Sequence, residues 1–245
     1  MSNTRAFREL KRLAYEANLD LARRGLAMFT FGNVSAFDPG RGVLAIKPSG
    51  VPYNRLRPED MVVVDLENRV VEGRLRPSSD TPTHTVLYQG FTDVRGVAHT
   101  HSPYAVSWAQ AGKPIPVLGT THADHLATEV PCTDTMDDRA VRGDYETETG
   151  KQIVRTFRRF DYRKTEMVLV SGHGPFTWGP SADQAVANSV ILEELAKMAL
   201  WTLCINPKAG RLKKSLVDRH YLRKHGKNAT YGQPGDRPCD ARKIH

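Results

Sequence analysis

The sequence predicts one α/β domain in which a sheet is sandwiched between helices. Its 245 residues are enough for one large domain with a sizeable core. Segments with helical spacing of apolar residues alternate with short, strand-like apolar runs. Neither an internal repeat nor a linker interrupts this alternation before about residue 206.

The first part of the chain is expected to form two helices and four short strands. The first helix covers residues 4–24, where apolar side chains recur at helical spacing before Gly25. Strand-like runs follow at residues 34–37, 43–47, 61–66 and 69–72, with turn residues between them. Thr81 and Pro82 open a helix that runs to about residue 91, because proline is favoured at the first helical position.

The rest of the chain continues the alternation up to a basic C-terminal segment. Strands are expected at residues 94–100, 117–121 and 167–171. Helices are expected at residues 104–111, 145–160, 182–203 and 212–224, and Gly226 ends the last of them.

The composition excludes several classes of protein. Apolar residues make up 40% and charged residues 25% of the chain, which is typical of a folded globular protein. No apolar run approaches the roughly 18 residues of a membrane span, and the charged, periodic N-terminus is unlike a signal peptide. Three widely spaced cysteines, Cys132, Cys204 and Cys239, encode no disulfide framework. We expect a soluble, cytoplasmic protein with no membrane partner.

The net charge of +8 lies entirely in the C-terminal segment. Residues 1–204 carry 24 basic and 24 acidic side chains, whereas residues 205–245 carry 11 basic and three acidic ones. A strongly basic protein raises nucleic acid as a partner, but the body of this chain is neutral. The basic C-terminal segment is therefore the feature that needs a function.

Three histidines form the sharpest chemical pattern. His99 and His101 are two residues apart at the end of an expected strand, so their imidazoles point to the same side. His173 lies between two glycines after another strand, which is a poor place for a core residue. Three imidazoles with one further ligand are typical of a catalytic divalent-metal site, zinc in particular. The alternative is a set of hydrogen-bonded histidines without a metal.

Asp80 and the two serines before it have two interpretations each. Asp80 is the nearest candidate for a fourth ligand, or it is a carboxylate at a helix N-terminus. Ser78 and Ser79 offer hydroxyl and backbone N–H groups to a phosphate, or they belong to an ordinary helix cap. Two small polar turns, Gly32-Asn33 and Ser49-Gly50, allow the backbone to approach a ligand closely.

A polar loop carries further candidates for chemistry. His122 and His125 are either ligands or ordinary loop residues, and Asp124 is either an acid/base or a solvated carboxylate. The nucleotide-binding patterns GxxxxGK[ST] and GxGxxG are absent, as is the GxSxG pattern of serine hydrolases.

Taken together, these segments resemble the class II aldolase/adducin superfamily and, within it, the L-ribulose-5-phosphate 4-epimerases. The resemblance runs from about residue 8 to Gln233. It is carried by residues 32–36, 46–51, 76–84, 99–102, 108–112, 119–124, 173–176 and 220–226. It departs from the family pattern at His125, where a tyrosine is common, and residues 234–245 extend beyond it as an expected flexible tail.

The resemblance implies a single domain over residues 1–233 with a three-layer α/β/α fold and a central, mainly antiparallel sheet. It implies a homotetramer whose active sites lie between subunits. It also implies a divalent metal, Zn²⁺ or else Mn²⁺ or Co²⁺, on His99, His101 and His173 with Asp80 as an additional ligand.

The resemblance further implies a phosphorylated pentulose as substrate, epimerised at C4 in pentose catabolism. The implied substrate-binding residues are Gly32, Asn33, Lys47, Ser49, Gly50, Ser78, Ser79, Thr120, His220 and Arg223. Asp124 and Tyr231 are the implied acid/base pair, with Tyr231, His220 and Arg223 donated by the basic segment, residues 205–233, of a neighbouring subunit. That role accounts for the basic segment without nucleic acid.

Two other function classes remain as alternatives. A sugar-phosphate aldolase of the fuculose-1-phosphate aldolase kind would release its aldehyde fragment. An adducin-like interaction module or a nucleic-acid binder would need no metal ligands, whereas this chain has all four.

Overall fold

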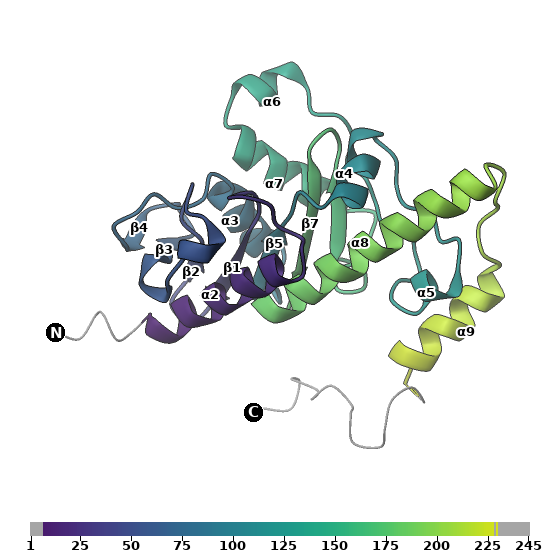
Figure 1. The fold of residues 1–245 in the computed structure, drawn as a ribbon, viewed down its shortest axis with the longest axis horizontal. Helices are drawn as coiled ribbons and strands as arrows, with labels where there is room; N and C mark the ends of the chain where they lie inside the picture. The colour runs from purple at the N-terminus through teal and green to yellow at the C-terminus, as the bar shows by residue number, and fades with distance from the viewer. Residues whose placement is uncertain (1–6, 228, 230–245) are drawn as a thin grey trace.

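Seven strands form one antiparallel sheet, in the order β4-β3-β2-β1-β5-β7-β6 (Figure 1). The structure is a computed structural model that describes residues 7–227 and 229. The strands are β1 (Asn33–Asp38), β2 (Val43–Ile46), β3 (Val62–Asp65), β4 (Val70–Glu72), β5 (Gly96–His99), β6 (Met167–Val170) and β7 (Gly174–Gly179).

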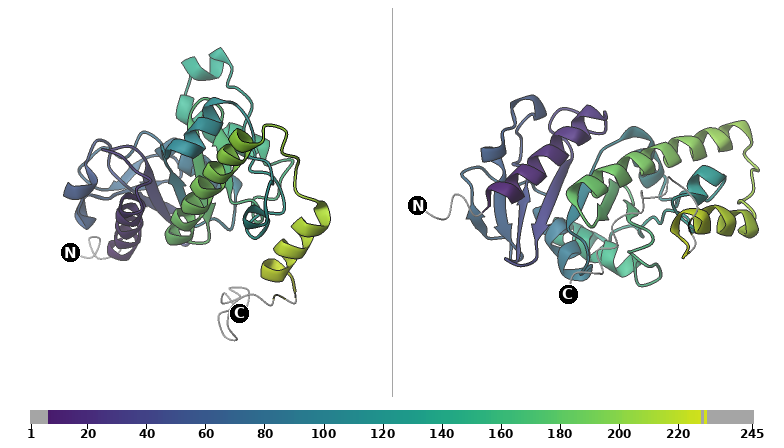
Figure 2. Two further views of the ribbon diagram at one scale, coloured as in Figure 1. Left: turned by 45° about the vertical axis from the view of Figure 1, so that its right-hand side comes forward. Right: turned by 90° about the horizontal axis from the view of Figure 1, so that it is seen from below.

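Helices cover both faces of this sheet. They are α2 (Arg8–Arg23), α3 (Thr81–Gly90), α4 (Pro103–Gln110), α5 (Thr120–Ala123), α6 (Asp138–Arg142), α7 (Tyr145–Thr156), α8 (Ala182–Ile205) and α9 (Lys214–His225), with short 3₁₀ turns η1 (Tyr53–Arg55) and η2 (Pro58–Asp60). Figure 2 shows α2 and α8 lying across the same face of the sheet. The helices α3 and α7 pack on the opposite face, and the expected three-layer α/β/α arrangement is confirmed.

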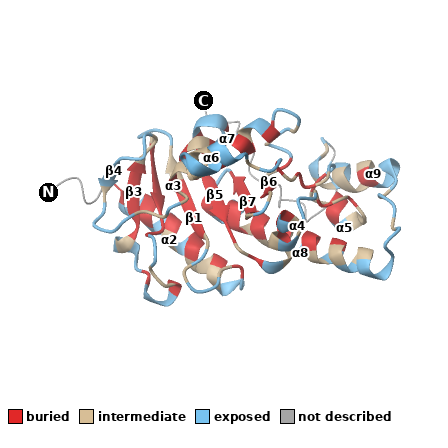
Figure 3. Cartoon of the chain, turned by 90° about the horizontal axis from the view of Figure 1, so that it is seen from above, coloured by how far each residue is buried: buried red, intermediate tan, exposed pale blue. Residues whose placement is uncertain are grey.

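The alternation of side chains along each strand divides the core into two layers. Val43 and Ala45 of β2 pack toward α2 and α8, whereas Leu44 and Ile46 pack toward α3 and α7. Successive side chains of a strand point to opposite faces, so a strand that is buried on both faces contributes to both layers. In Figure 3 the buried residues run through the central strands, between the two layers of helices.

The helices α5 and α9 form a separate small cluster at one end of the molecule (Figure 1). Val117, Ala123 and Val217 are buried there together, against the half-buried Leu212. The helix α8 extends from the sheet toward this end, so α5 and α9 lie away from β1 to β4 (Figures 1 and 2). Within the described residues, no helix has both the length and the apolar character needed to cross a membrane.

Most of the predicted elements occur within one to three residues of their expected bounds, but one predicted strand is wrong, and one strand and one short helix were missed. The strand expected at residues 117–121 is wrong: Gly119 is extended, and the helix α5 begins at Thr120. The only pairing near it among described residues is an isolated bridge between Ile115 and Val130. The alternation of apolar and polar residues there reflects a loop that buries Val117, not a strand.

The second correction is a strand that the sequence did not predict. Gly174–Gly179 forms β7, which pairs with both β5 and β6. Its glycines and Pro175 are typical of a turn, but Phe176 and Trp178 are fully buried and hold the strand in the core. The short helix α6 was also not expected. Residues 234–245 and Tyr231 lie outside the described residues.

Candidate functional site

The antiparallel sheet brings the ends of several strands to one edge. The start of β1, the end of β2, the end of β5 and the turn between β6 and β7 all lie at this edge, because each strand runs opposite to its neighbour. A cavity of about 400 Å³ opens there. Its lining comes from these four places, from the start of α3 and from the start of α7: Thr30, Phe31, Gly32, Asn33, Lys47, Pro48, Ser49, Gly50, Ser78, Ser79, Asp80, His99, His101, Tyr145, Glu146 and His173.

The three predicted histidines meet in this cavity. Ring nitrogen atoms that could ligate a metal, one each from His99, His101 and His173, all lie within 4.8 Å of one another. His99 Nε2 is 3.0 Å from His101 Nε2. Pairing of Asn33 with His99 between β1 and β5, and of His99 with Phe176 between β5 and β7, fixes the first histidine in the sheet.

His99 is held in the form that a metal ligand needs. Its Nδ1 donates to the carbonyl of Pro175 at 2.9 Å, which leaves a lone pair on Nε2 toward the other histidines. Its ring stacks on Phe176, with centroids 4.3 Å apart. Burial lowers the pKa of His99 to about 3, although Asp80 opposes the shift. Three closely spaced imidazoles fit a divalent cation, because each ring can offer a nitrogen lone pair.

Asp80 serves the cavity and not the helix that follows it. It precedes α3, but its side chain makes no capping hydrogen bond. Its carboxylate instead accepts a hydrogen bond from Asn33 Nδ2 at 2.6 Å. Burial would raise the pKa of Asp80, but His99, His84 and the bond from Asn33 together lower it below its usual value. An ionised carboxylate therefore lies in the same cavity as the histidine cluster.

Another part of the cavity wall suits an anion. The loops at residues 47–49 and 76–78 lie side by side: Ser49 N donates to the carbonyl of Arg76, and Ser78 N donates to that of Lys47, both at 3.0 Å. Ser78 and the exposed Ser49, Gly50 and Ser79 face the same space. Gly32 approaches the site so closely that an added Cβ would lie 2.9 Å from the carbonyl oxygen of His99.

Lys47 supplies the positive charge on this wall. Its side chain is 2% exposed, and its Nζ lies 3.4 Å from the carbonyls of Thr30 and Pro48. No salt bridge to Lys47 occurs within residues 7–227 and 229. Burial lowers its pKa to about 8. A buried ammonium without a carboxylate partner is suited to an anionic ligand such as a phosphate.

Tyr145 and Glu146 belong to the cavity, and sequence reasoning missed them. Both come from the first turn of α7, and the Tyr145 hydroxyl lies 3.3 Å from Nδ1 of His173. The sequence did indicate that an amphipathic helix begins at residue 145, and Asp144 caps this helix in the structure. Nothing in the local sequence indicated that this helix start lies beside the histidines.

A second polar cluster lies apart from the cavity, on α5 and α9. The Asp124 carboxylate accepts hydrogen bonds from His220 Nδ1 at 3.0 Å and from Arg223 Nη2 at 2.9 Å. Burial would raise the pKa of Asp124, but the bonds from Arg223 and His220 lower it. Thr120 is the first residue of α5, and Asp124 follows its last. None of these four residues lines the cavity of its own chain.

His122 and His125 are not part of the histidine cluster formed by His99, His101 and His173. His122 is buried, and its Nε2 donates to the carbonyl of Thr128 at 2.9 Å. Burial lowers the pKa of His125, which lines a separate small cavity beside α9. The structural interpretation of His122 and His125 is therefore the better one.

Comparison with known proteins finds relatives that match most of this chain. Residues 12–200 match the model of the Class II Aldolase and Adducin N-terminal domain. The chain is 50% identical over 225 residues to proteins named L-ribulose-5-phosphate 4-epimerase UlaF from Salmonella paratyphi B (strain ATCC BAA-1250 / SPB7) and from Salmonella typhi. Each match covers 92% of this chain and 99% of the relative.

A solved structure shares the fold at lower identity. It is an L-fuculose 1-phosphate aldolase, with a TM-score of 0.73 and 22% identity over 88% of this chain and 95% of that one.

Proposed function

The chain belongs to the class II aldolase and adducin family, and we propose that it is an L-ribulose-5-phosphate 4-epimerase, which interconverts L-ribulose 5-phosphate and D-xylulose 5-phosphate. One observation carries this proposal. A single cavity brings together three imidazoles, a carboxylate, serine hydroxyls and a buried lysine. That cavity lies in a chain that is 50% identical to proteins named as this epimerase.

The proposed metal is zinc, held by His99, His101 and His173 with Asp80 as an additional ligand. The tight spacing and the neutral state of His99 support these ligands. The lowered pKa of Asp80 supports an anionic ligand beside them. When bound, a divalent cation supplies Lewis-acid stabilisation of negative charge on the substrate oxygens. Mn²⁺ and Co²⁺ are the alternatives.

The phosphate is proposed to bind to Lys47 and the serines of the same cavity. Lys47 supplies a charge there, and Ser49, Ser78 and Ser79 supply hydroxyls. Gly32 and Gly50, which have no Cβ, are proposed to let the backbone approach the sugar closely beside Asn33. A firm hold on the phosphate keeps the fragment that bears it from leaving the cavity during the reaction.

Inversion at C4 requires more than removal of a proton from that carbon, because the C4 hydrogen is not acidic. A base removes the proton of the C4 hydroxyl, and the C3–C4 bond breaks to give the enediolate of dihydroxyacetone and glycolaldehyde phosphate. The aldehyde then turns its other face toward the enediolate. The C3–C4 bond forms again as an acid returns a proton to the C4 oxygen. The reaction needs one proton carrier on each face.

Asp124 and Tyr231 are proposed as these two proton carriers. Asp124 lies away from the cavity of its own chain, together with His220 and Arg223. We therefore propose that this cluster completes the cavity of a neighbouring subunit in a homotetramer, which is the role expected of the basic segment. Tyr231 is proposed to accompany it, and Thr120 to contact the substrate from the start of α5.

The test is direct. Purified protein supplied with zinc and L-ribulose 5-phosphate should form D-xylulose 5-phosphate without accumulating free aldehyde. A time course in which glycolaldehyde phosphate accumulates would favour an aldolase instead. No conversion of the substrate under any of the three metals would contradict both activities.

A further inference from the structure

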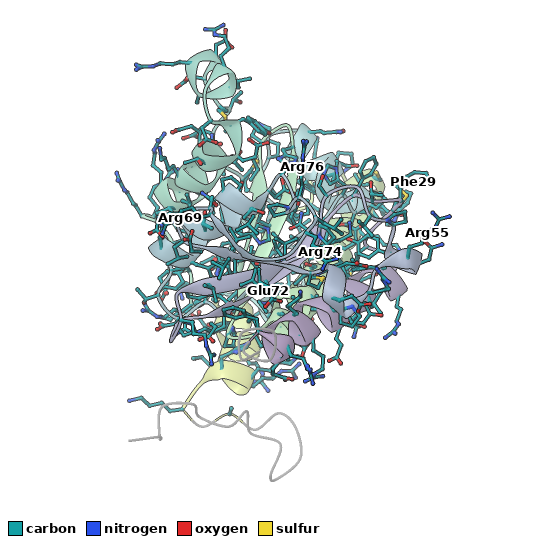
Figure 4. All side chains as sticks on the ribbon, turned by 90° about the vertical axis from the view of Figure 1, so that its left-hand side faces the viewer. Phe29, Arg55, Arg69, Glu72, Arg74 and Arg76 are labelled. Atoms are coloured by element: carbon teal, nitrogen blue, oxygen red, sulfur yellow. The ribbon has the colours of Figure 1, made fainter. Side chains whose placement is uncertain are left out.

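An exposed apolar loop lies between α2 and β1. Three of its residues, Met28, Phe29 and Phe31, are at least half exposed, and Phe29 is 79% exposed. Phe29 has φ +54°, a left-handed conformation that bulky side chains rarely adopt. Figure 4 shows Phe29 at the rim of the molecule. We call residues 28–31 the Phe29 loop; its strain and exposure are explained if another protein surface covers it.

The Phe29 loop is fixed beside the histidine cluster. The Phe31 ring contacts the ring of His101, with centroids 5.6 Å apart. The Tyr53 hydroxyl lies 3.2 Å from the carbonyl oxygen of Phe31 and 2.8 Å from that of Gly32. Whatever covers the Phe29 loop is therefore held next to the cavity.

A second apolar surface lies along the C-terminal half of α8. It is a groove of about 350 Å³, whose exposed apolar residues include Met198, Trp201 and Ile205. Gly119, Thr121 and His122 of the α5 region form part of its wall. We call it the α8 groove. Figure 1 shows the end of α8 close to α5 and α9.

We propose that the Phe29 loop of one copy of this chain docks into the α8 groove of a second copy. Two aromatic side chains are well suited to such a groove, since aromatic anchors in apolar pockets dominate interface energies. The contact joins two different surfaces, so it is head-to-tail and can repeat until a ring closes.

This inference rests on the proposed function, because it names the surfaces that bring Asp124 to a neighbour's cavity. Asp124 directly follows α5, which forms part of the groove wall. Phe31 in turn touches His101. Docking the loop into the groove therefore places the α5 end of one copy beside the histidine cluster of the other, and no separate contact is needed to align them.

A second copy fits the groove better than the C-terminal tail of the same chain. Residues 234–245 contain a single large aliphatic side chain, Ile244, among charged residues and prolines. The Phe29 loop offers three large apolar side chains in four residues, with no charge between them.

Substitution on either side of the contact tests the proposal. Phe29→Glu and Trp201→Glu should each raise the protein concentration at which the assembly dissociates by about tenfold or more, measured by sedimentation. Val71→Glu is the matched control, because Val71 is an exposed apolar residue on the edge strand β4. It should leave dissociation unchanged. Equal dissociation of all three variants and the parent protein would overturn the proposal.

Cross-linking tests the geometry directly and does not depend on activity. In chains that carry Cys204→Ser and Cys239→Ser, one preparation receives Met28→Cys and a differently tagged one receives Ile205→Cys. After mixing and subunit exchange, a short bismaleimide should join the two tags, whereas Val71→Cys paired with Ile205→Cys should give none. An assembly without the Met28–Ile205 cross-link would overturn this docking while leaving the epimerase proposal intact. If the cross-link forms in a protein that converts no L-ribulose 5-phosphate, the docking is supported and the epimerase proposal is overturned.

Discussion

Asn33 Nδ2 donates to the carboxylate of Asp80 across 2.6 Å, joining the first residue of β1 to the residue before α3. The same nitrogen lies 3.0 Å from the Ser78 hydroxyl. The other side-chain atom, Asn33 Oδ1, is buried without a hydrogen-bond partner among the described residues. One amide thus orients both a proposed metal ligand and a proposed phosphate ligand, and it presents a further acceptor.

Asn33→Ala should weaken metal binding by about 10–100-fold, the usual effect of losing a residue that orients a ligand. Asp80 would lose a hydrogen bond that holds its carboxylate in place. Metal content after dialysis against graded chelator measures the effect, with His99→Asn as the comparison that should remove the metal. Parent-like metal retention in Asn33→Ala would show that Asp80 needs no support.

The pH dependence should report Lys47. In the free enzyme, burial lowers its pKa to about 8. The ammonium is therefore present at neutral pH, and it is lost as the pH rises through about 8. We expect kcat/KM to fall about tenfold per pH unit above that point, through a rise in KM.

Lys47→Arg provides the control for this fall of kcat/KM at alkaline pH. A guanidinium keeps its proton throughout the accessible range, so the alkaline fall should disappear even if the bulkier side chain lowers activity overall. If Lys47→Arg retains the same alkaline limb, another group is responsible for it.

Gly32→Ala should destabilise the protein by about 1–3 kcal/mol. Gly32 has φ +78°, and an added Cβ would lie 2.9 Å from the carbonyl oxygen of His99. Gly25→Ala is a matched control, since Gly25 has φ +73° with nothing within 4 Å of the added Cβ. Denaturant unfolding of both variants separates the cost of the positive φ from the cost of the close contact. The extra loss of unfolding free energy in Gly32→Ala measures the contact of the added Cβ with β5. Equal losses would mean that the close approach is easily relieved.

Two inactive variants should restore activity when mixed. His99→Asn removes a proposed metal ligand, and Asp124→Asn removes a proposed proton carrier from a different surface. If each site takes its metal from one copy and Asp124 from the next, random exchange in a ring yields intact sites at about a quarter of the interfaces. Recovered turnover after subunit exchange measures this. Absence of recovery, with exchange verified by tags, would place both residues in the same chain's site.

The sequence predicted the metal half of the cavity well because that half depends on local patterns. His99 is the last residue of β5 and His101 lies two residues further on, so alternation alone places their side chains on one side. The sequence indicated Asn33 only as part of a small polar turn, and its bond to Asp80 depends on the alignment of β1 with β5. Such an alignment is a tertiary property that a single sequence does not display.

The residues that sequence reasoning missed entered the cavity through long-range packing. Tyr145 is brought to His173 because α7 packs against α3 and the sheet. The same limitation applies to the cluster of Asp124 with His220 and Arg223, whose members are nearly 100 residues apart. Strand β7 was hidden for a different reason, since its glycines and Pro175 favour a turn when tertiary contacts are ignored.

The pairing of His99 with both Asn33 and Phe176 has a consequence for how the protein folds. If β5 slipped by one residue against its neighbours, Thr100 would stand opposite Asn33, and both His99 and His101 would turn to the other side of the sheet. A misaligned chain would then have no cluster of imidazoles to offer. Cation binding during refolding would therefore stabilise the correct alignment of the central strands, because only that alignment can bind the cation.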